Sequence, residues 1–289
     1  MIRHCALFLS LVSMVLFASL IISCGGSSHS GPTPCTGAFN VVGDWQGSVT
    51  SGGTSVDFLG TIDTAGNAVF FDPAADIVTV SPLTGACSFS STETVYESIA
   101  DGGPATGSGT ASGNVTSDTA LSGSESISGG NSGTFSFSSY SPLTGSVTAL
   151  SGLVSAVAQG QISDSLILTL GGTSSSITFT GTEAANGCTV SGTFTEEGTN
   201  NVFDVTYNYS GTNPVCTGSL TGSGFESNSD LFTLNNNGSG TYLYAVITSS
   251  SGSFVVEILP SGADALRQAH TPRMSTSFSQ VFGLNRLQR

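Results

Sequence analysis

The chain has 289 residues, a net charge of −14, and charged side chains at only 8% of its positions. Its 5 basic residues are all arginines, and after Arg3 the next one is Arg267. The body between them cannot neutralise phosphates, which argues against nucleic acid as a partner and leaves cationic partners open. Because the chain between Cys24 and Arg267 holds no lysine or arginine and only one histidine, His29, we exclude Ser-His-Asp, Schiff-base and arginine-clamp mechanisms there.

The N-terminal segment has the layout of a secretory signal, since Arg3 is followed by an uncharged stretch over residues 6–22. The motif Ile21-Ile22-Ser23-Cys24-Gly25 resembles the lipobox of bacterial lipoproteins, although Ile22 is bulkier than the usual residue there. The resemblance implies that a signal helix, residues 1–23, is cleaved, that Cys24 is lipidated, and that the protein is sorted to the outer membrane. We therefore expect a lipid-anchored protein of the bacterial cell envelope that meets the membrane through its N-terminal lipid. An uncleaved transmembrane anchor is the alternative.

The segment 24–38 is small, polar and rich in Pro and Gly, which predicts a flexible tether. Beyond Cys24 the exported chain keeps four cysteines, an even number in a compartment that permits disulfides. Of the three possible pairings we prefer Cys35 with Cys87 and Cys188 with Cys216, because each bridge then closes within one half of the chain. No pair has C-x-x-C spacing, so we expect no metal site at these cysteines.

The body combines Ser, Thr, Gly and Asn with Val, Ile, Phe and Tyr, a mixture that predicts an all-β protein. The clearest strand is Phe203 to Tyr209, in which aromatic and aliphatic residues alternate with polar ones. Residues 101–133, rich in Ser-Gly, are either long solvated strands or a poorly ordered excursion. The expected strands are 41–50, 55–62, 67–71, 76–80, 92–99, 104–116, 132–139, 165–170, 175–182, 188–195, 201–209, 216–223, 230–234, 241–248 and 253–259.

A weak internal repeat favours two related β units, residues 39–146 and residues 147–260, over one larger barrel or sandwich. Ser81-Pro82-Leu83-Thr84-Gly85 recurs at 141–145, and the strand that begins at Gly43 has a degenerate counterpart beginning at Gly152. Each of these opening strands is followed by a hairpin, Val56 to Phe71 in the first unit and Leu166 to Phe179 in the second. The predicted fold is therefore an antiparallel β-barrel or β-sandwich, built twice.

The motif Gly43-Asp44-Trp45 resembles the G-x-W start of lipocalin-like barrels. This resemblance implies a barrel interior that includes Trp45, Phe203 and Tyr207. Such an interior is either filled by its own side chains or open to a small apolar ligand.

Carboxylates and amides supply the remaining candidate chemistry. Glu93, Glu97, Glu196 and Glu197 are the nearest pairs for glycoside hydrolysis, but we expect all four to be solvated surface groups. Asp72 and Asp76, and separately Asn228, Asp230 and Asn235 to Asn237, are oxygen donors suited to Ca²⁺, although turn chemistry explains them without a metal. We expect no cofactor.

The C-terminal segment 261–289 carries Arg267, Arg273, Arg286 and Arg289 and is expected to be a disordered basic tail. Its charge also suggests docking onto the acidic body or contact with anionic headgroups.

The mature chain is similar to Ser/Thr/Gly-rich lipoproteins of unassigned function from environmental Gram-negative bacteria, with a Gly187 to Gly192 strand and Cys216 about one hairpin later. This resemblance implies fold and location only. The leading hypothesis is a non-catalytic envelope lipoprotein whose β domain binds a small apolar ligand or a surface partner. An adhesin-like interaction module is the second hypothesis, and a carboxylate-based glycoside hydrolase is a distant third.

Overall fold

The computed structural model describes residues 38–83, 85–99, 105–140, 152–161, 163–198, 201–214, 216–227, 242–249 and 252–258, together with Ser277, Gln280 and Phe282. Cys24, Cys35, the tether up to residue 37, residues 228–241 with the second set of Ca²⁺ candidates, and most of the segment 261–289 lie outside the described residues.

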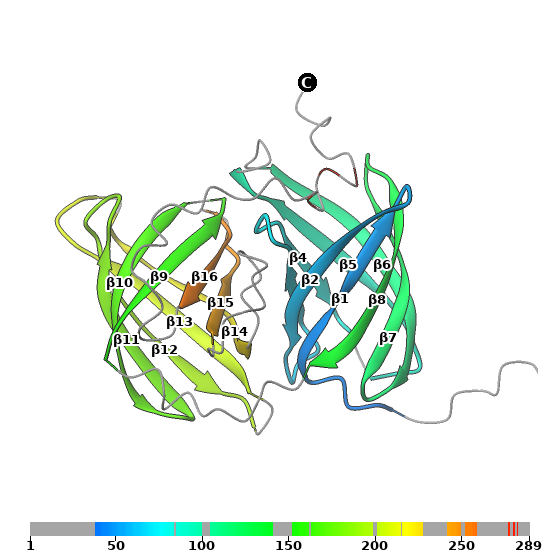
Figure 1. The fold of residues 1–289 in the computed structure, drawn as a ribbon, viewed down its shortest axis with the longest axis horizontal. Helices are drawn as coiled ribbons and strands as arrows, with labels where there is room; N and C mark the ends of the chain where they lie inside the picture. The colour runs from blue at the N-terminus through cyan, green and yellow to red at the C-terminus, as the bar shows by residue number, and fades with distance from the viewer. Residues whose placement is uncertain are drawn as a thin grey trace, which may run out of the picture. The chain divides into compact units, whose positions relative to one another are not determined.

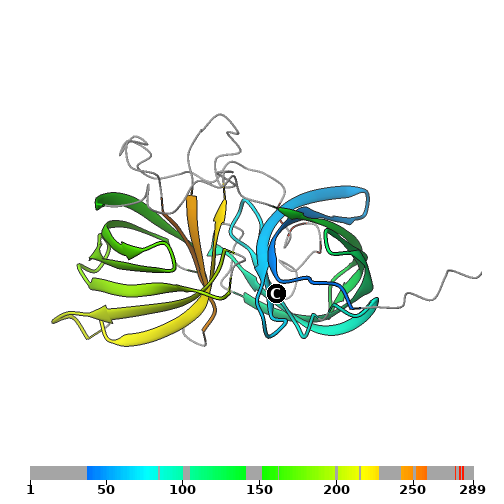
Figure 2. The ribbon, with the colours of Figure 1, turned by 90° about the horizontal axis from the view of Figure 1, so that it is seen from below.

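The first eight strands form a closed barrel in which each strand pairs antiparallel with the next, and β8 pairs with β1 to close the ring (Figures 1 and 2). The bounds are β1 (Gly43–Ser51), β2 (Thr54–Ile62), β3 (Ala68–Phe71), β4 (Ile77–Ser81), β5 (Ser88–Glu97), β6 (Ala105–Ser117), β7 (Ala120–Ile127) and β8 (Ser132–Tyr140). We call this barrel 1.

The next eight strands repeat the same up-and-down topology, and β16 pairs with β9 to close the second ring. The bounds are β9 (Gly152–Gly160), β10 (Asp164–Thr173), β11 (Ser176–Glu183), β12 (Thr189–Glu196), β13 (Val202–Ser210), β14 (Gly218–Ser227), β15 (Tyr242–Ile247) and β16 (Phe254–Ile258). We call this barrel 2.

The predicted all-β, antiparallel fold with two related units is confirmed. The strands of barrel 1 lie within residues 39–146 and those of barrel 2 within 147–260. The repeated opening strand is the first strand of each barrel, β1 and β9, and the repeated hairpin is β2–β3 in one and β10–β11 in the other. The recurring pentapeptide does not mark equivalent places: Ser81 ends β4, whereas residues 141–145 follow β8 and lie outside the described residues.

The Ser-Gly-rich region 101–133 contributes strands β6 and β7 to the wall of barrel 1. Strand β7 was missing from the sequence prediction. Along β6 and β7, Ser and Thr point outward to solvent, while the inward positions hold mostly Gly and Ala with Val115, Leu121 and Ile127. Gly113 pairs with Gly123, and a Cβ added at Gly113 would lie 2.9 Å from the Gly123 Cα. These two strands therefore approach one another closely and fill little of the barrel interior.

Three strands are buried along their whole length: β3, β15 and β16. Their outer faces join one hydrophobic cluster with members from both barrels, in which the Phe71 ring lies 5.2 Å from Tyr244 and 5.9 Å from Phe225 between centroids. The uninterrupted apolar sequences Ala68–Phe71 and Tyr242–Ile247 follow from this burial on two faces, because a strand with one wet face would alternate. The cluster consists of Leu59, Val69, Phe71, Ala75, Ile77, Phe225, Tyr242, Tyr244, Val246 and Val255.

The two ends of barrel 1 are closed by side chains from distant parts of the sequence. At one end the Trp45 indole N–H donates to the Val41 carbonyl at 2.8 Å, so its buried polar atom is satisfied. At the other end Phe282 is 0% exposed and belongs to the barrel core; its carbonyl accepts from the Asn131 N–H at 3.0 Å. A Cβ at Gly133 would lie 2.6 Å from the Phe282 ring, so the glycine makes room for it. The expected disordered tail is thus wrong at Phe282, because hydrophobic burial holds this residue in place.

Barrel 2 contains the predicted disulfide between Cys188 and Cys216, which joins the start of β12 to the start of β14. Cys87 is also disulfide-bonded. Cys35, its expected partner, lies outside the described residues.

Candidate ligand cavity in barrel 1

The interior of barrel 1 contains a cavity with walls that are almost entirely apolar. The space free of protein atoms is about 390 Å³, a volume that includes a part open to solvent, and about 30 Å³ is accessible to the centre of a water-sized sphere. By that second measure one water needs about 10–15 Å³, so the cavity admits two or three water-sized groups. The lining residues are Val49, Phe58, Phe70, Val78, Val80, Leu83, Phe89, Ala111, Leu121, Glu125, Phe135 and Phe137.

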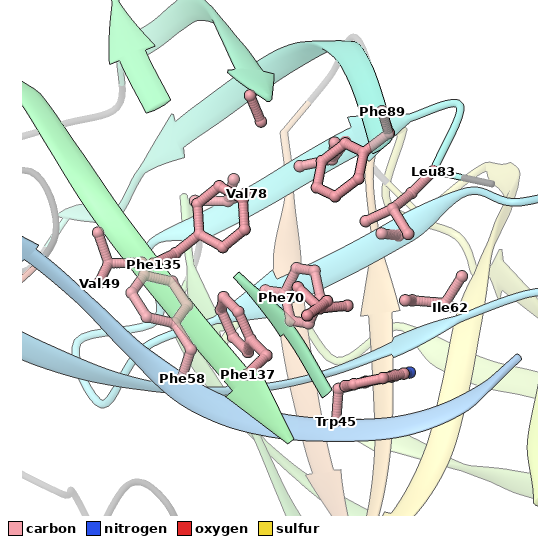
Figure 3. Close-up of a cluster of buried hydrophobic side chains, with 14 of the residues drawn as sticks. Trp45, Val49, Phe58, Ile62, Phe70, Val78, Leu83, Phe89, Phe135 and Phe137 are labelled. Atoms are coloured by element: carbon pink, nitrogen blue, oxygen red, sulfur yellow. The ribbon is translucent and has the colours of Figure 1, made fainter. Parts of the chain in front are cut away.

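Five phenylalanines dominate these walls, and Figure 3 shows Phe58, Phe70, Phe135 and Phe137 turned toward one another. The Phe70 and Phe137 rings lie 4.5 Å apart between centroids, and Phe89 lies 6.1 Å from Phe135. The rings come from β2, β3, β5 and β8, while the inward glycines of β6 and β7 supply no bulk opposite them. A cavity remains because large residues on one side of the ring face very small ones on the other.

Barrel 2 has a tightly buried core of its own, in which Phe194, Phe203, Val205 and Tyr207 are each 1% exposed. The expectation that Trp45 shares one interior with Phe203 and Tyr207 is wrong, because the chain forms two separate barrels. All three side chains are buried, but Trp45 closes an end of barrel 1 and the other two belong to the core of barrel 2.

Two carboxyl groups lie inside barrel 1, on Glu93 of β5 and Glu125 of β7, which are 2% and 6% exposed. The strand between them, β6, places Gly109 beside Glu93 and Ala111 beside Glu125. Since neither residue has a long side chain, the two carboxyls reach one another across β6. Glu125 also lines the cavity.

The prediction that Glu93 and Glu97 are solvated surface groups is wrong. They share the inward face of β5 with Phe89 and Val95. Both glutamates are 2% exposed, because closure of the barrel puts this face inside.

Glu125 was not among the site residues predicted from the sequence. Its inward position could have been inferred from the alternation of Leu121, Glu125 and Ile127 with serines, in a segment that is otherwise of low complexity.

The Glu93–Glu125 pair is held in an environment that disfavours charge. Burial raises the pKa of both carboxyls, and the proximity of Glu93 raises the pKa of Glu125 further. Neither oxygen of Glu93, nor Oε1 of Glu125, finds a hydrogen-bond donor elsewhere in the described residues. Those residues also contain no Lys, Arg or His to neutralise the pair. At neutral pH the pair therefore retains at least one proton.

Asp72 and Asp76, the Ca²⁺ candidates within the described residues, accept hydrogen bonds from backbone N–H groups. Asp72 Oδ1 accepts from the Ala74 and Asp76 N–H groups at 2.9 and 3.0 Å, and Asp76 Oδ1 accepts from the Ser98 N–H at 2.7 Å. This turn chemistry shapes the β3–β4 connection. Within the described ranges no three His, Cys, Asp or Glu side chains gather in a way that could hold a metal ion.

The turn after β12 brings the carboxylate of Glu197 to a turn of barrel 1. Glu197 Oε2 accepts from the Thr64 N–H at 3.0 Å and from the Thr64 hydroxyl at 2.8 Å. Burial raises the Glu197 pKa, but the hydrogen bonds from Thr64 and Asp204 together outweigh it and lower the pKa below its usual value. Glu196 lies at the end of β12, and the structure does not bring it to the Glu93–Glu125 pair.

A second pair of carboxyls, Asp164 and Glu183, lies near Tyr207 and Tyr209 in barrel 2. Burial and the Asp164 neighbour raise the Glu183 pKa, and Asp164 Oδ1 accepts from the Ser165 and Ala185 N–H groups at 2.7 and 3.0 Å. Tyr207 belongs to the hydrophobic core of barrel 2 and Tyr209 packs against it, so the pair lies at the edge of this core.

Searches with the complete chain matched no family model, no curated protein and no solved structure. Over the part of the chain that the structure describes, no helix is long and apolar enough to cross a membrane.

Proposed function

We propose that the chain is a non-catalytic, lipid-anchored protein of the bacterial cell envelope whose barrel 1 binds a small, largely apolar ligand. The observation that carries the binding function is the apolar cavity inside barrel 1. Anchoring through Cys24 is supported by the lipobox pattern that precedes the barrels. The pair of interior carboxyls does not support glycoside hydrolysis, since two or three water-sized groups occupy less space than a sugar ring.

The size of the cavity limits the ligand and its affinity. A molecule of about four non-hydrogen atoms fits with small movements of the surrounding side chains. At a ceiling of roughly 1.5 kcal/mol per atom, its binding free energy cannot exceed about 6 kcal/mol, which corresponds to a Kd of about 40 μM. Barrel 1 is therefore suited to reversible uptake of an abundant small molecule.

Xenon tests the cavity directly, because this atom enters dry apolar cavities without needing polar contacts. We expect the ¹²⁹Xe NMR signal of dissolved xenon to shift with the concentration of the mature protein. The variant Ala111→Leu adds three carbon atoms to the cavity wall and should abolish most of that shift. The matched control Ser112→Leu adds an apolar side chain at the neighbouring, exposed position and should leave the shift in place. A shift that survives Ala111→Leu unchanged would refute the proposed site.

Lipid anchoring has a separate test. The mass of the protein purified from envelopes should equal residues 24–289 plus a lipid, and Cys24→Ala should abolish the lipid mass and release the protein from membranes. An unmodified Cys24 in the wild-type protein would refute the anchor and leave the cavity result untouched.

A further inference from the structure

Among the described residues, barrel 1 places acidic groups, and no basic ones, around an aromatic cavity. The described residues that face inward include Glu93, Glu97 and Glu125. On this basis we propose that the cavity selects a small organic cation, an alkylammonium ion, which the Glu93–Glu125 pair holds by its N–H groups. The inference rests on the proposed function, because it specifies the ligand of the same cavity.

The carboxyl pair lacks hydrogen-bond donors. Three of the four oxygens of the pair, both of Glu93 and Oε1 of Glu125, are buried and find no donor elsewhere in the described residues. Buried acceptors in folded proteins nearly always have a partner, so an unmet set of this size indicates a donor that the described chain does not supply. An ammonium group brings two or three N–H donors at one point.

The walls of the cavity are largely aromatic. Phe58, Phe70, Phe89, Phe135 and Phe137 present aromatic faces and edges to the cavity, and a cation is attracted to the face of an aromatic ring. Anionic ligands are excluded by the carboxyl pair. A metal ion is disfavoured, because no cluster of three potential ligand side chains occurs within the described ranges and the rest of the wall offers no oxygen donors.

Charge balance within the pair also favours a cation. When the pair holds one shared proton it carries a single negative charge, and one bound ammonium ion balances that charge. A neutral alcohol of the same size satisfies hydrogen bonds but leaves that charge uncompensated, which is costly in an apolar interior. The cavity should therefore distinguish an amine from the alcohol of equal shape.

Matched ligands provide the test. The mature protein, with Val and Leu methyl groups labelled, is titrated at pH 7 with n-propylamine hydrochloride and in parallel with 1-propanol, while ammonium chloride serves as the ionic control. The methyl signals of Val78 and Leu121, which line the cavity, report binding. We expect propylamine to bind at least about tenfold more tightly than propanol, as charge-assisted hydrogen bonds are stronger than neutral ones.

Two variants link that preference to the pair. The double variant Glu93→Gln/Glu125→Gln keeps both side-chain shapes and removes the charge, so it should reduce the amine-to-alcohol ratio to below about threefold with the propanol affinity nearly unchanged. The single variant Glu125→Gln leaves the negative charge on Glu93 and should keep the preference. The control Glu183→Gln removes a buried carboxyl from barrel 2 and should leave the ratio intact.

The outcomes separate the two proposals. Equal affinities for amine and alcohol, or a preference that survives the double glutamine variant, would overturn the ammonium ligand and leave a binding cavity in place. Absence of binding by either molecule, together with a negative xenon result, would overturn the proposed function itself.

Discussion

Replacing Glu125 by glutamine should stabilise the protein at neutral pH. In the wild-type barrel, burial and the neighbouring Glu93 raise the pKa of Glu125 from 4.5 to about 9. A carboxyl with a pKa that is higher in the folded state stabilises the fold while the pH is below its unfolded-state pKa. That stabilisation is lost as the pH rises from about 4.5 toward 9, because the unfolded chain ionises first. Glutamine has the same shape and does not ionise.

The magnitude follows from the size of the shift. Each pH unit between 4.5 and 9 changes the wild-type stability by at most about 1.4 kcal/mol, so at pH 7 the advantage of Glu125→Gln has an upper bound of about 3 kcal/mol. The amide N–H₂ also offers Glu93 a hydrogen bond and takes away a like-charged neighbour. Below pH 4.5 both proteins are neutral at position 125, and their stabilities should agree within about 0.5 kcal/mol.

Urea unfolding of both proteins, monitored by Trp45 fluorescence at half-unit intervals from pH 4 to pH 8, measures the difference. The exposed-carboxyl variant Asp57→Asn controls for the change in net charge and should follow the wild type throughout. A difference between Glu125→Gln and wild type that stays flat with pH, or a variant that is less stable at pH 7, would contradict the burial and coupling of the pair.

Changes at three further places test the packing of the two barrels. Phe282→Ala should lower the free energy of unfolding by about 3 kcal/mol, since a fully buried ring is lost, and Phe282→Leu should retain more than half of it in urea titrations. Replacing Cys188 and Cys216 together by alanine opens a loop of 28 residues, so the unfolding free energy should fall by about 3 to 4 kcal/mol, as measured by thermal denaturation. Gly109→Val places a Cβ 2.9 Å from the Ile127 side chain and should cost about 1–3 kcal/mol while separating the carboxyl pair, which the pH profile of stability would reveal.

Much of the fold could be predicted because its strands obey simple alternation. In Phe203 to Tyr209 the large residues fall on one face, and the structure buries Phe203, Val205 and Tyr207 in the core of barrel 2. The internal repeat located the two units because the similar opening strands, β1 and β9, each begin one barrel. Both predictions depended only on local sequence.

The carboxyl pair could not be predicted, because its position depends on ring closure. Glu93 and Glu125 are 32 positions apart by their numbers, and they meet only when β6 separates them in a curved sheet with Gly109 at the crossing point. The region of β7 has too few large apolar residues for a strand prediction, and the inward glycines that weaken this signal are the residues that bring the walls close together. The cavity is a property of the closed ring, which local sequence does not express.

Phe282 has a consequence for how the molecule is made. Barrel 1 ends its last strand at Tyr140, yet the residue that seals one of its ends is encoded far downstream, after every strand of barrel 2. During synthesis the first barrel therefore emerges with an open end and reaches its final form only after Phe282 has been made. A purification tag placed after Arg289, although remote from barrel 1 in the sequence, would follow this seal by seven residues, so a tag in a loop of barrel 2 is the better choice for studies of the cavity.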